Sequence, residues 1–175
     1  MKRSVCIWQL LGFIFTSLSG VLLHFLYNWT GRAAIVAPFC AINESTWEHM
    51  KLLFWPMLIF ALVQSSAFKN IDSFFCIKAQ GIIIGLVLIP VFFYTYNGAI
   101  DKSPDWLNIS IYFLTAAIVY FYETRKILNP TVSLWLKSPG IAVILLIVVG
   151  LLFVIFTYNT PELGIFEIPT SAVSK

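Results

Sequence analysis

Residues 141–158 read IAVILLIVVGLLFVIFTY, a stretch without a single charged side chain. A helix needs about 20 mostly apolar residues, with a range near 17–25, to cross the hydrocarbon core of a bilayer. A helix also satisfies all of its backbone hydrogen bonds within its own segment, as the lipid interior requires. This stretch therefore predicts a transmembrane helix.

Four other stretches have similar length and hydrophobicity, at residues 5–27, 50–67, 79–96 and 106–122. The intervals between them hold charges, proline, asparagine or glycine, which typically end such segments. The run 5–27 is longer than the apolar core of a signal peptide, about 7–15 residues, so it is expected to be a retained helix. We therefore predict an all-α, polytopic transmembrane bundle of about five spans, formed as a single domain over residues 1–175.

The overall composition agrees with this prediction. Hydrophobic residues make up 59% of the chain and charged residues only 11%, whereas soluble domains carry roughly 25% charged residues. The net charge of +3, spread over few charged side chains, argues against nucleic-acid binding, which needs a dense basic surface. The expected environment is the lipid bilayer, and the expected location is the cell membrane, as a multi-pass protein.

The basic residues predict an orientation. If the N-terminus is cytoplasmic, seven of the eleven lysines and arginines fall on the cytoplasmic side and four on the outer side. Basic residues in short loops favour the cytoplasmic side of a membrane, while acidic residues contribute little. An odd number of spans then predicts an N-in, C-out topology.

Two features predict how the helices pack. Gly81 and Gly85 form a G-x-x-x-G pair in the third stretch, which allows close approach of two helices and here favours packing within the chain. Glu123 lies at the inner end of the fourth stretch, where Lys78 or Arg125 is the expected partner.

The segment around Asn43-Glu44-Ser45-Thr46-Trp47-Glu48-His49 has a structural interpretation. Ser45 and Glu48 have the spacing of a capping box, in which two side chains satisfy free N–H groups at the start of a helix. Alternatively, Asn43 is the cap, with Ile42 and Trp47 as the hydrophobic staple. In either case the polar residues would only begin the second helix.

The same segment also has a functional interpretation. Glu44 and Glu48 are four residues apart, so on a helix they would share a face and repel each other, and a proton or a cation would relieve that repulsion. His49 is adjacent, and His24, near the end of the first stretch, is expected to point inward or toward water because ionisable groups rarely face lipid. Three more polar residues are expected at this end of the bundle: Asn97, Asp101 and Asp105.

His24, Glu44, Glu48 and His49 are therefore the candidate catalytic residues. Two imidazoles and two carboxylates suit a divalent metal such as zinc, and they equally suit general acid and base chemistry without a metal. The residues alone leave both interpretations open, and the cofactor unknown.

Three segments carry a family resemblance: residues 24–31, residues 43–52 with the N-E-S-x-W-E-H string and then Pro56, and residues 156–166. Together they resemble an uncharacterised family of small bacterial integral membrane proteins, a domain of unknown function. The resemblance implies a bacterial cell-membrane protein and no particular activity. Ile168 stands where that pattern leads us to expect an acid, which argues against a role of the tail in a polar site.

Three functions are compatible with these patterns. The first is a membrane enzyme facing the outer side, acting on a lipid or lipid-linked substrate through the His/Glu residues. The second is a small-molecule binding or transport component, in which helices kinked at Pro56 and Pro90 frame a cavity. The third is a structural or assembly protein, in which the polar side chains of this segment make only capping and loop hydrogen bonds. The sequence leaves the reaction and the oligomeric state open.

Overall fold

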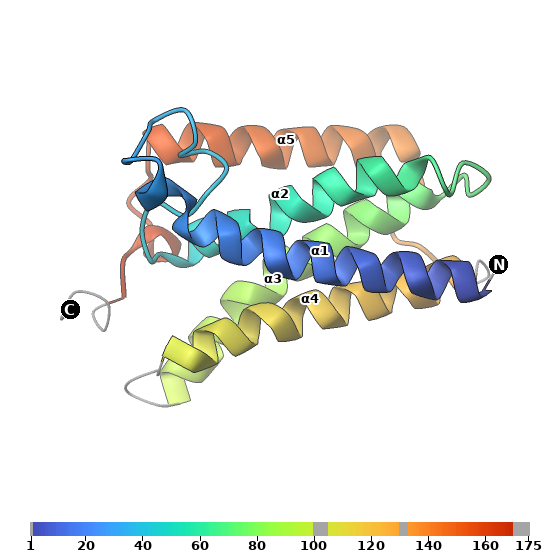
Figure 1. Ribbon diagram of the computed structural model, residues 1–175, viewed down its shortest axis with the longest axis horizontal. Coiled ribbons are helices and arrows are strands. Elements are labelled where there is room, and N and C mark those ends of the chain that lie inside the picture. Colours follow the sequence, from blue (N-terminus) through green and yellow to red (C-terminus); the bar gives the residue numbers. More distant parts are fainter. Residues whose placement is uncertain (1, 100–104, 130–132, 170–175) are drawn as a thin grey trace.

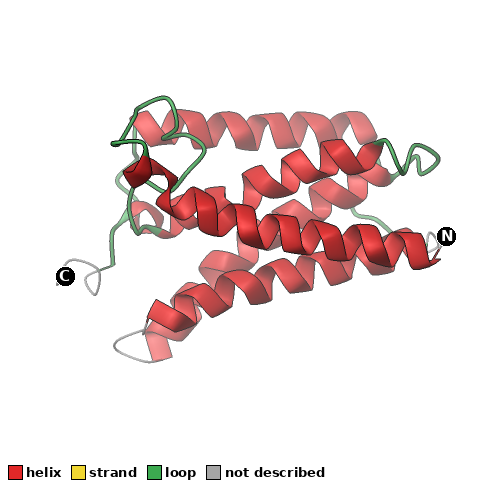
Figure 2. Ribbon diagram, in the orientation of Figure 1, coloured by secondary structure: helices red, strands yellow, loops and turns green. Residues whose placement is uncertain are grey.

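The computed structural model describes residues 2–99, 105–129 and 133–169. These residues contain helices and loops without any strand, as Figure 2 shows, which confirms the prediction of an all-α fold. The helices are α1 Lys2–Trp29, α2 Thr46–Ser65, α3 Phe74–Ala99, α4 Asp105–Leu128 and α5 Pro139–Tyr158, followed by the short 3-10 helix η1 Gly164–Phe166.

Successive helices run in opposite directions, so the start of α1 and the end of α5 lie at opposite ends of the bundle (Figure 1). Helices α1 to α4 form a ring in which each helix contacts the next and α4 returns to α1. Helix α5 packs outside this ring against α3. The end that carries the loop between α1 and α2 also receives the tail with η1, which contacts α2.

Three helices, α1, α3 and α5, are long and apolar enough to cross a membrane. Helices α1 and α5 also expose large apolar side chains, such as Leu18 on α1 and Ile144 on α5, as expected of surfaces that face lipid. The membrane crossings of α2 and α4 and the N-in, C-out orientation remain predictions.

Helix α2 supplies much of the core, because Leu53, Phe54 and Met57 on it are completely buried. A Cβ at Gly85 of α3 would come within 2.5 Å of Leu53 Cδ2. A Cβ at Gly81 would collide with the carboxylate of Glu123 on α4. The two glycines therefore bring α3 close to α2 and α4, which confirms packing within the chain.

Glu123 is fully buried and pairs with Lys78, whose Nζ lies 2.5 Å from Glu123 Oε2. The prediction of a basic partner is thus confirmed, with Lys78 rather than Arg125. The pair joins α3 to α4 in the half of the bundle that contains the start of α1.

Candidate functional site

Three of the four predicted site residues meet at one end of the bundle. His24 lies on α1, Glu44 in the loop after α1, and His49 in the first turns of α2. Glu44 Oε1 is 3.8 Å from His24 Nε2, and Glu44 Oε2 is 3.5 Å from His49 Nε2. The two imidazole rings have their centroids 5.5 Å apart. We call these three residues the His–Glu–His cluster.

The start of α2 decides where Glu44 can lie. Ser45 is the N-cap, and its Oγ accepts a hydrogen bond from the backbone N–H of Glu48 at 3.4 Å. The backbone N–H of Ser45 donates to Asn43 Oδ1 instead of to the Glu48 carboxylate. Only half of the predicted capping box therefore forms, and Asn43 is not the cap. Because Glu44 precedes the helix, the expectation that it shares a helix face with Glu48 is wrong.

Glu48 is separated from the cluster by its own interactions. Its side chain is buried, and its Oε2 lies 2.5 Å from Lys51 Nζ and accepts a hydrogen bond from the backbone N–H of Ile42 at 2.9 Å. Lys51, also buried, donates to the carbonyl of Ala37 and to Thr157 Oγ1 on α5. The Glu48–Lys51 pair thus holds the α1–α2 loop between α2 and α5, which is a positioning role.

The loop has further attachments along its length. It leaves α1 through Gly31, which has a φ of +64°, a conformation that glycine adopts without strain. Trp55 Nε1 donates to the carbonyl of Pro38, and the hydroxyl of Tyr158 donates to the carbonyl of Ala34. Burial raises the pKa of the Cys40 thiol in this loop. These contacts fix the segment that presents Glu44.

The His–Glu–His cluster forms part of the wall of a cavity of about 580 Å³. The other walls come from all four helices of the ring and from Pro169 in the tail. Most of the lining is apolar, with Ile89 and Phe93 on α3 and Ile111 and Phe113 on α4. Its size and character are typical of small-molecule sites, which are mostly apolar with a few polar groups.

Three polar residues of the cavity wall were not predicted from the sequence: Thr46, Asn108 and Tyr112. Asn108 and Tyr112 are four residues apart on α4 and so share a helix face, a spacing that the sequence does contain. Of the residues expected here, Asn97 donates to the backbone of Phe93. Asp101 and the side chain of Asp105 lie outside the described part of the chain.

Tyr112 closes the inner side of the cavity. Its hydroxyl lies 2.8 Å from the carbonyl of Thr16 on α1 and 3.2 Å from that of Leu52 on α2. The hydroxyl occupies space that Gly20 leaves open, since a Cβ at Gly20 would collide with it. Tyr112 thus ties three helices together beside the site.

The hydrogen bond of His49 defines its tautomer. His49 Nδ1 lies 2.9 Å from the carbonyl oxygen of Ser45, and because a carbonyl only accepts, Nδ1 carries the proton. In neutral His49 the lone pair of Nε2 therefore faces Glu44. Such an arrangement can exchange a proton with a bound molecule, and His24, Glu44 and His49 are also the residues that could hold a metal.

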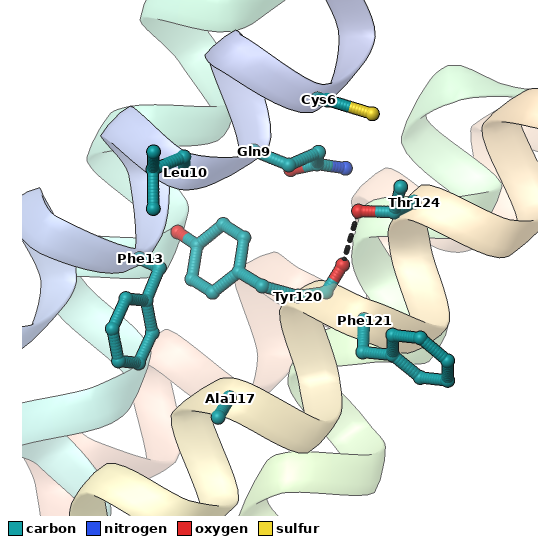
Figure 3. Close-up of a pocket in the computed structure, with 8 residues that line it drawn as sticks. All are labelled: Cys6, Gln9, Leu10, Phe13, Ala117, Tyr120, Phe121 and Thr124. Atoms are coloured by element: carbon teal, nitrogen blue, oxygen red, sulfur yellow. Dashed lines mark hydrogen bonds between the residues drawn. The ribbon is translucent and has the colours of Figure 1, made fainter. Parts of the chain in front are cut away.

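A second polar region lies in the other half of the bundle, beside a hollow of about 240 Å³ between α1 and α4 (Figure 3). Gln9 lines this hollow, and its Oε1 accepts a hydrogen bond from Gln64 Nε2 at 3.5 Å. Among the described residues, Gln9 Nε2 and Glu123 Oε1 are buried without a hydrogen-bond partner. Gln9 and His24 are fifteen residues apart on α1, about 22 Å along the helix.

Comparison with known proteins places this chain in a family. A model described as a family of unknown function, DUF6512, matches residues 2–172. No curated protein and no solved structure matches the chain. The match therefore supports the expectation of a family of unknown function, and it assigns no activity. Because it spans nearly the whole sequence, the chain belongs to the DUF6512 family.

Proposed function

We propose that this chain is an enzyme of the bacterial cell membrane that acts on a lipid or lipid-linked substrate. The observation that carries the proposal is the joining of the His–Glu–His cluster to a largely apolar cavity within the helical ring. In the predicted N-in topology this end of the bundle faces the outer side of the membrane.

The cavity wall fits an amphiphilic substrate. An acyl or isoprenoid chain would contact Ile89, Phe93 and Ile111, while its polar end would lie beside Glu44 and His49. Burial of apolar substrate surface supplies binding free energy, at roughly 25 cal/mol per Å². The few polar groups then orient the end of the molecule that reacts.

The cluster has the groups needed for proton transfer. A histidine whose Nδ1 donates to a backbone carbonyl presents Nε2 in a defined direction, as His49 does. Glu44 is half-exposed, and its ion-pair contacts in the described structure are with the two histidines. A carboxylate and an imidazole within reach of a bound headgroup are typical of general acid–base catalysis.

The first test is lipid binding. The detergent-purified protein should retain an amphiphile that mass spectrometry identifies in an organic extract. Val21→Trp, which fills the cavity from a half-exposed position on α1, should abolish this retention. Leu18→Trp is the matched control, because Leu18 lies on the exposed face of the same helix and outside the cavity lining.

The second test is turnover. Wild-type protein incubated with a bacterial polar lipid extract should change the mass of one lipid class, and Glu44→Gln should not. Retention without any mass change would contradict the enzymatic part of the proposal. If no amphiphile is retained and no lipid changes, the whole proposal is overturned.

A transport component is the second candidate function. The buried Lys78–Glu123 pair, with Gln9 and Gln64 nearby, favours it, because ionisable residues within membrane helices commonly line substrate or ion routes. Reconstituted vesicles would distinguish the two, since transport requires Lys78 and Glu123 and moves a solute without altering it. A purely structural role has less support, because Ser45 makes the capping bond and Asn43 accepts from the Ser45 N–H, while Glu44 makes neither bond.

A further inference from the structure

We infer that the His–Glu–His cluster is a zinc site with three protein ligands and one coordination position open to the cavity. This inference deepens the proposed function and rests on the same residues. Metal binding and lipid binding are nevertheless measured separately, so either can fail alone.

Hydrogen-bond acceptors of His49 and Glu44 face each other. With Nδ1 of His49 donating to the Ser45 carbonyl, a neutral His49 directs the lone pair of Nε2 at the Glu44 carboxylate. Two acceptors in this arrangement need a positive charge between them. A charged N–H to carboxylate hydrogen bond would be about 2.7–2.9 Å long, whereas the two Glu44 contacts are 3.5 and 3.8 Å.

The separations between these atoms fit a bound metal ion better than a shared proton. Ligand atoms about 2.1 Å from a tetrahedral zinc ion lie about 3.4 Å from one another. Here Glu44 Oε2 is 3.5 Å from His49 Nε2 and Glu44 Oε1 is 3.8 Å from His24 Nε2. One ligand atom from each residue can be chosen so that all three lie within 4.8 Å of one another. Glu44 is half-exposed, so its side chain can rotate to close the remaining gap.

Contacts outside the cluster already hold His49 and Glu44 in place. Histidine ligands of metals almost always donate their other ring N–H to a carbonyl or carboxylate, which fixes the ring. His49 already makes such a bond to Ser45, and Ser45 is itself fixed as the helix cap. Glu44 is held next to Ser45 in a loop that the buried Glu48–Lys51 pair attaches to α2. The site is therefore prepared without the metal.

The ligand types indicate the ion and its use. Two imidazoles and one carboxylate suit zinc, whereas Mg²⁺ and Ca²⁺ prefer six or more oxygen ligands. Structural zinc sites have four protein ligands, and catalytic sites have three with a fourth position for water or substrate. All three residues of the cluster line the cavity, so the fourth position would be reached from the space proposed for the substrate.

The experiment uses full-length protein purified through a tag without histidine and stripped of metal. Titration with zinc should give about one ion per chain, whereas Mg²⁺ and Ca²⁺ at the same concentrations should not bind. His49→Ala, Glu44→Gln and His24→Ala should each weaken zinc affinity at least about 100-fold, the upper end of what even supporting residues contribute. Glu162→Gln, in the exposed tail, is the control and should bind zinc as wild type does.

Cobalt substitution of the wild type keeps the test decisive if a variant fails to fold. Co²⁺ should give the intense visible bands of four-coordination, without the near-ultraviolet band of a thiolate ligand. Absence of zinc binding in the wild type, equal binding by all variants, or a six-coordinate cobalt spectrum would each overturn the inference. Zinc binding without retention of an amphiphile would support the metal site and contradict the proposed substrate.

Discussion

Replacement of Lys51 by methionine tests whether a buried ion pair holds the site loop in place. The change keeps most of the side-chain volume and removes the cation that lies 2.5 Å from Glu48 Oε2. Glu48 is only 3% exposed, so its carboxylate would stay buried with only the Ile42 N–H as donor. Breaking a buried pair in this way costs about 3–5 kcal/mol.

The double variant Glu48→Gln with Lys51→Met separates charge from packing. No buried charge remains in the double variant. Its loss in free energy of unfolding then comes only from the hydrogen bonds that Lys51 made to Ala37 and Thr157, about 1–3 kcal/mol in total. Glu48→Gln alone leaves Lys51 as the unpaired buried charge and should also cost about 3–5 kcal/mol. The double-mutant cycle should therefore give a coupling of about 3 kcal/mol or more.

The assay is unfolding by sodium dodecyl sulfate in mixed micelles. Far-UV circular dichroism follows the helices, and tryptophan fluorescence follows the six tryptophans together, among them Trp55, which donates to the carbonyl of Pro38 in the loop. Lys69→Met, at an exposed position between α2 and α3, is the control and should change the free energy of unfolding by less than about 0.5 kcal/mol. A coupling below about 1 kcal/mol would refute the reasoning.

Three further predictions concern packing, reactivity and orientation. Gly20→Ala should lower the free energy of unfolding by about 1–3 kcal/mol, because the new methyl group collides with the Tyr112 hydroxyl. Gly98→Ala, where a Cβ meets open space, should leave stability unchanged or raise it by up to about 1 kcal/mol, and equal losses in the same sodium dodecyl sulfate titration would contradict this account. A membrane-permeant maleimide should label exposed Cys6 in the folded protein at neutral pH and spare Cys40, whose buried thiol has a raised pKa and should react only at higher pH. Peptide mass spectrometry measures both sites, and rapid labelling of Cys40 at neutral pH would be the contrary result. A phosphatase fused to the C-terminus should be active outside the cytoplasm, and a fluorescent protein at the N-terminus should fluoresce in the cytoplasm. The reverse pattern would overturn the N-in topology.

The helical fold and the meeting of the two histidines could be predicted from the sequence. The five apolar runs each form a helix, because hydrophobicity over a long stretch decides helix formation in lipid. His24 lies near the end of the first run and His49 directly precedes the second. Adjacent antiparallel helices joined by one loop bring such ends together, and the ring centroids are indeed 5.5 Å apart.

The different roles of Glu44 and Glu48 could not be predicted, because they depend on where the helix begins. The N-cap at Ser45 leaves Glu44 in the loop and turns Glu48 inward. Local spacing allowed a capping box, but the backbone N–H of Ser45 donates to Asn43 Oδ1, and the Glu48 carboxylate binds Lys51 and the Ile42 N–H. The four-residue spacing alone does not show which side of the cap each acid occupies.

The chain's amino-acid order by itself determined that it forms apolar helices and that its histidines lie at one end of them, since both properties depend on neighbours along the chain. Only the tertiary structure decided which acid joins the histidines and that a cavity adjoins them. The burial of Glu48 requires Lys51, which in turn contacts Thr157 on α5, 106 residues away. The cavity likewise requires Tyr112 of α4 to fit beside Gly20 of α1. Contacts between segments so distant in sequence form only when the helices pack.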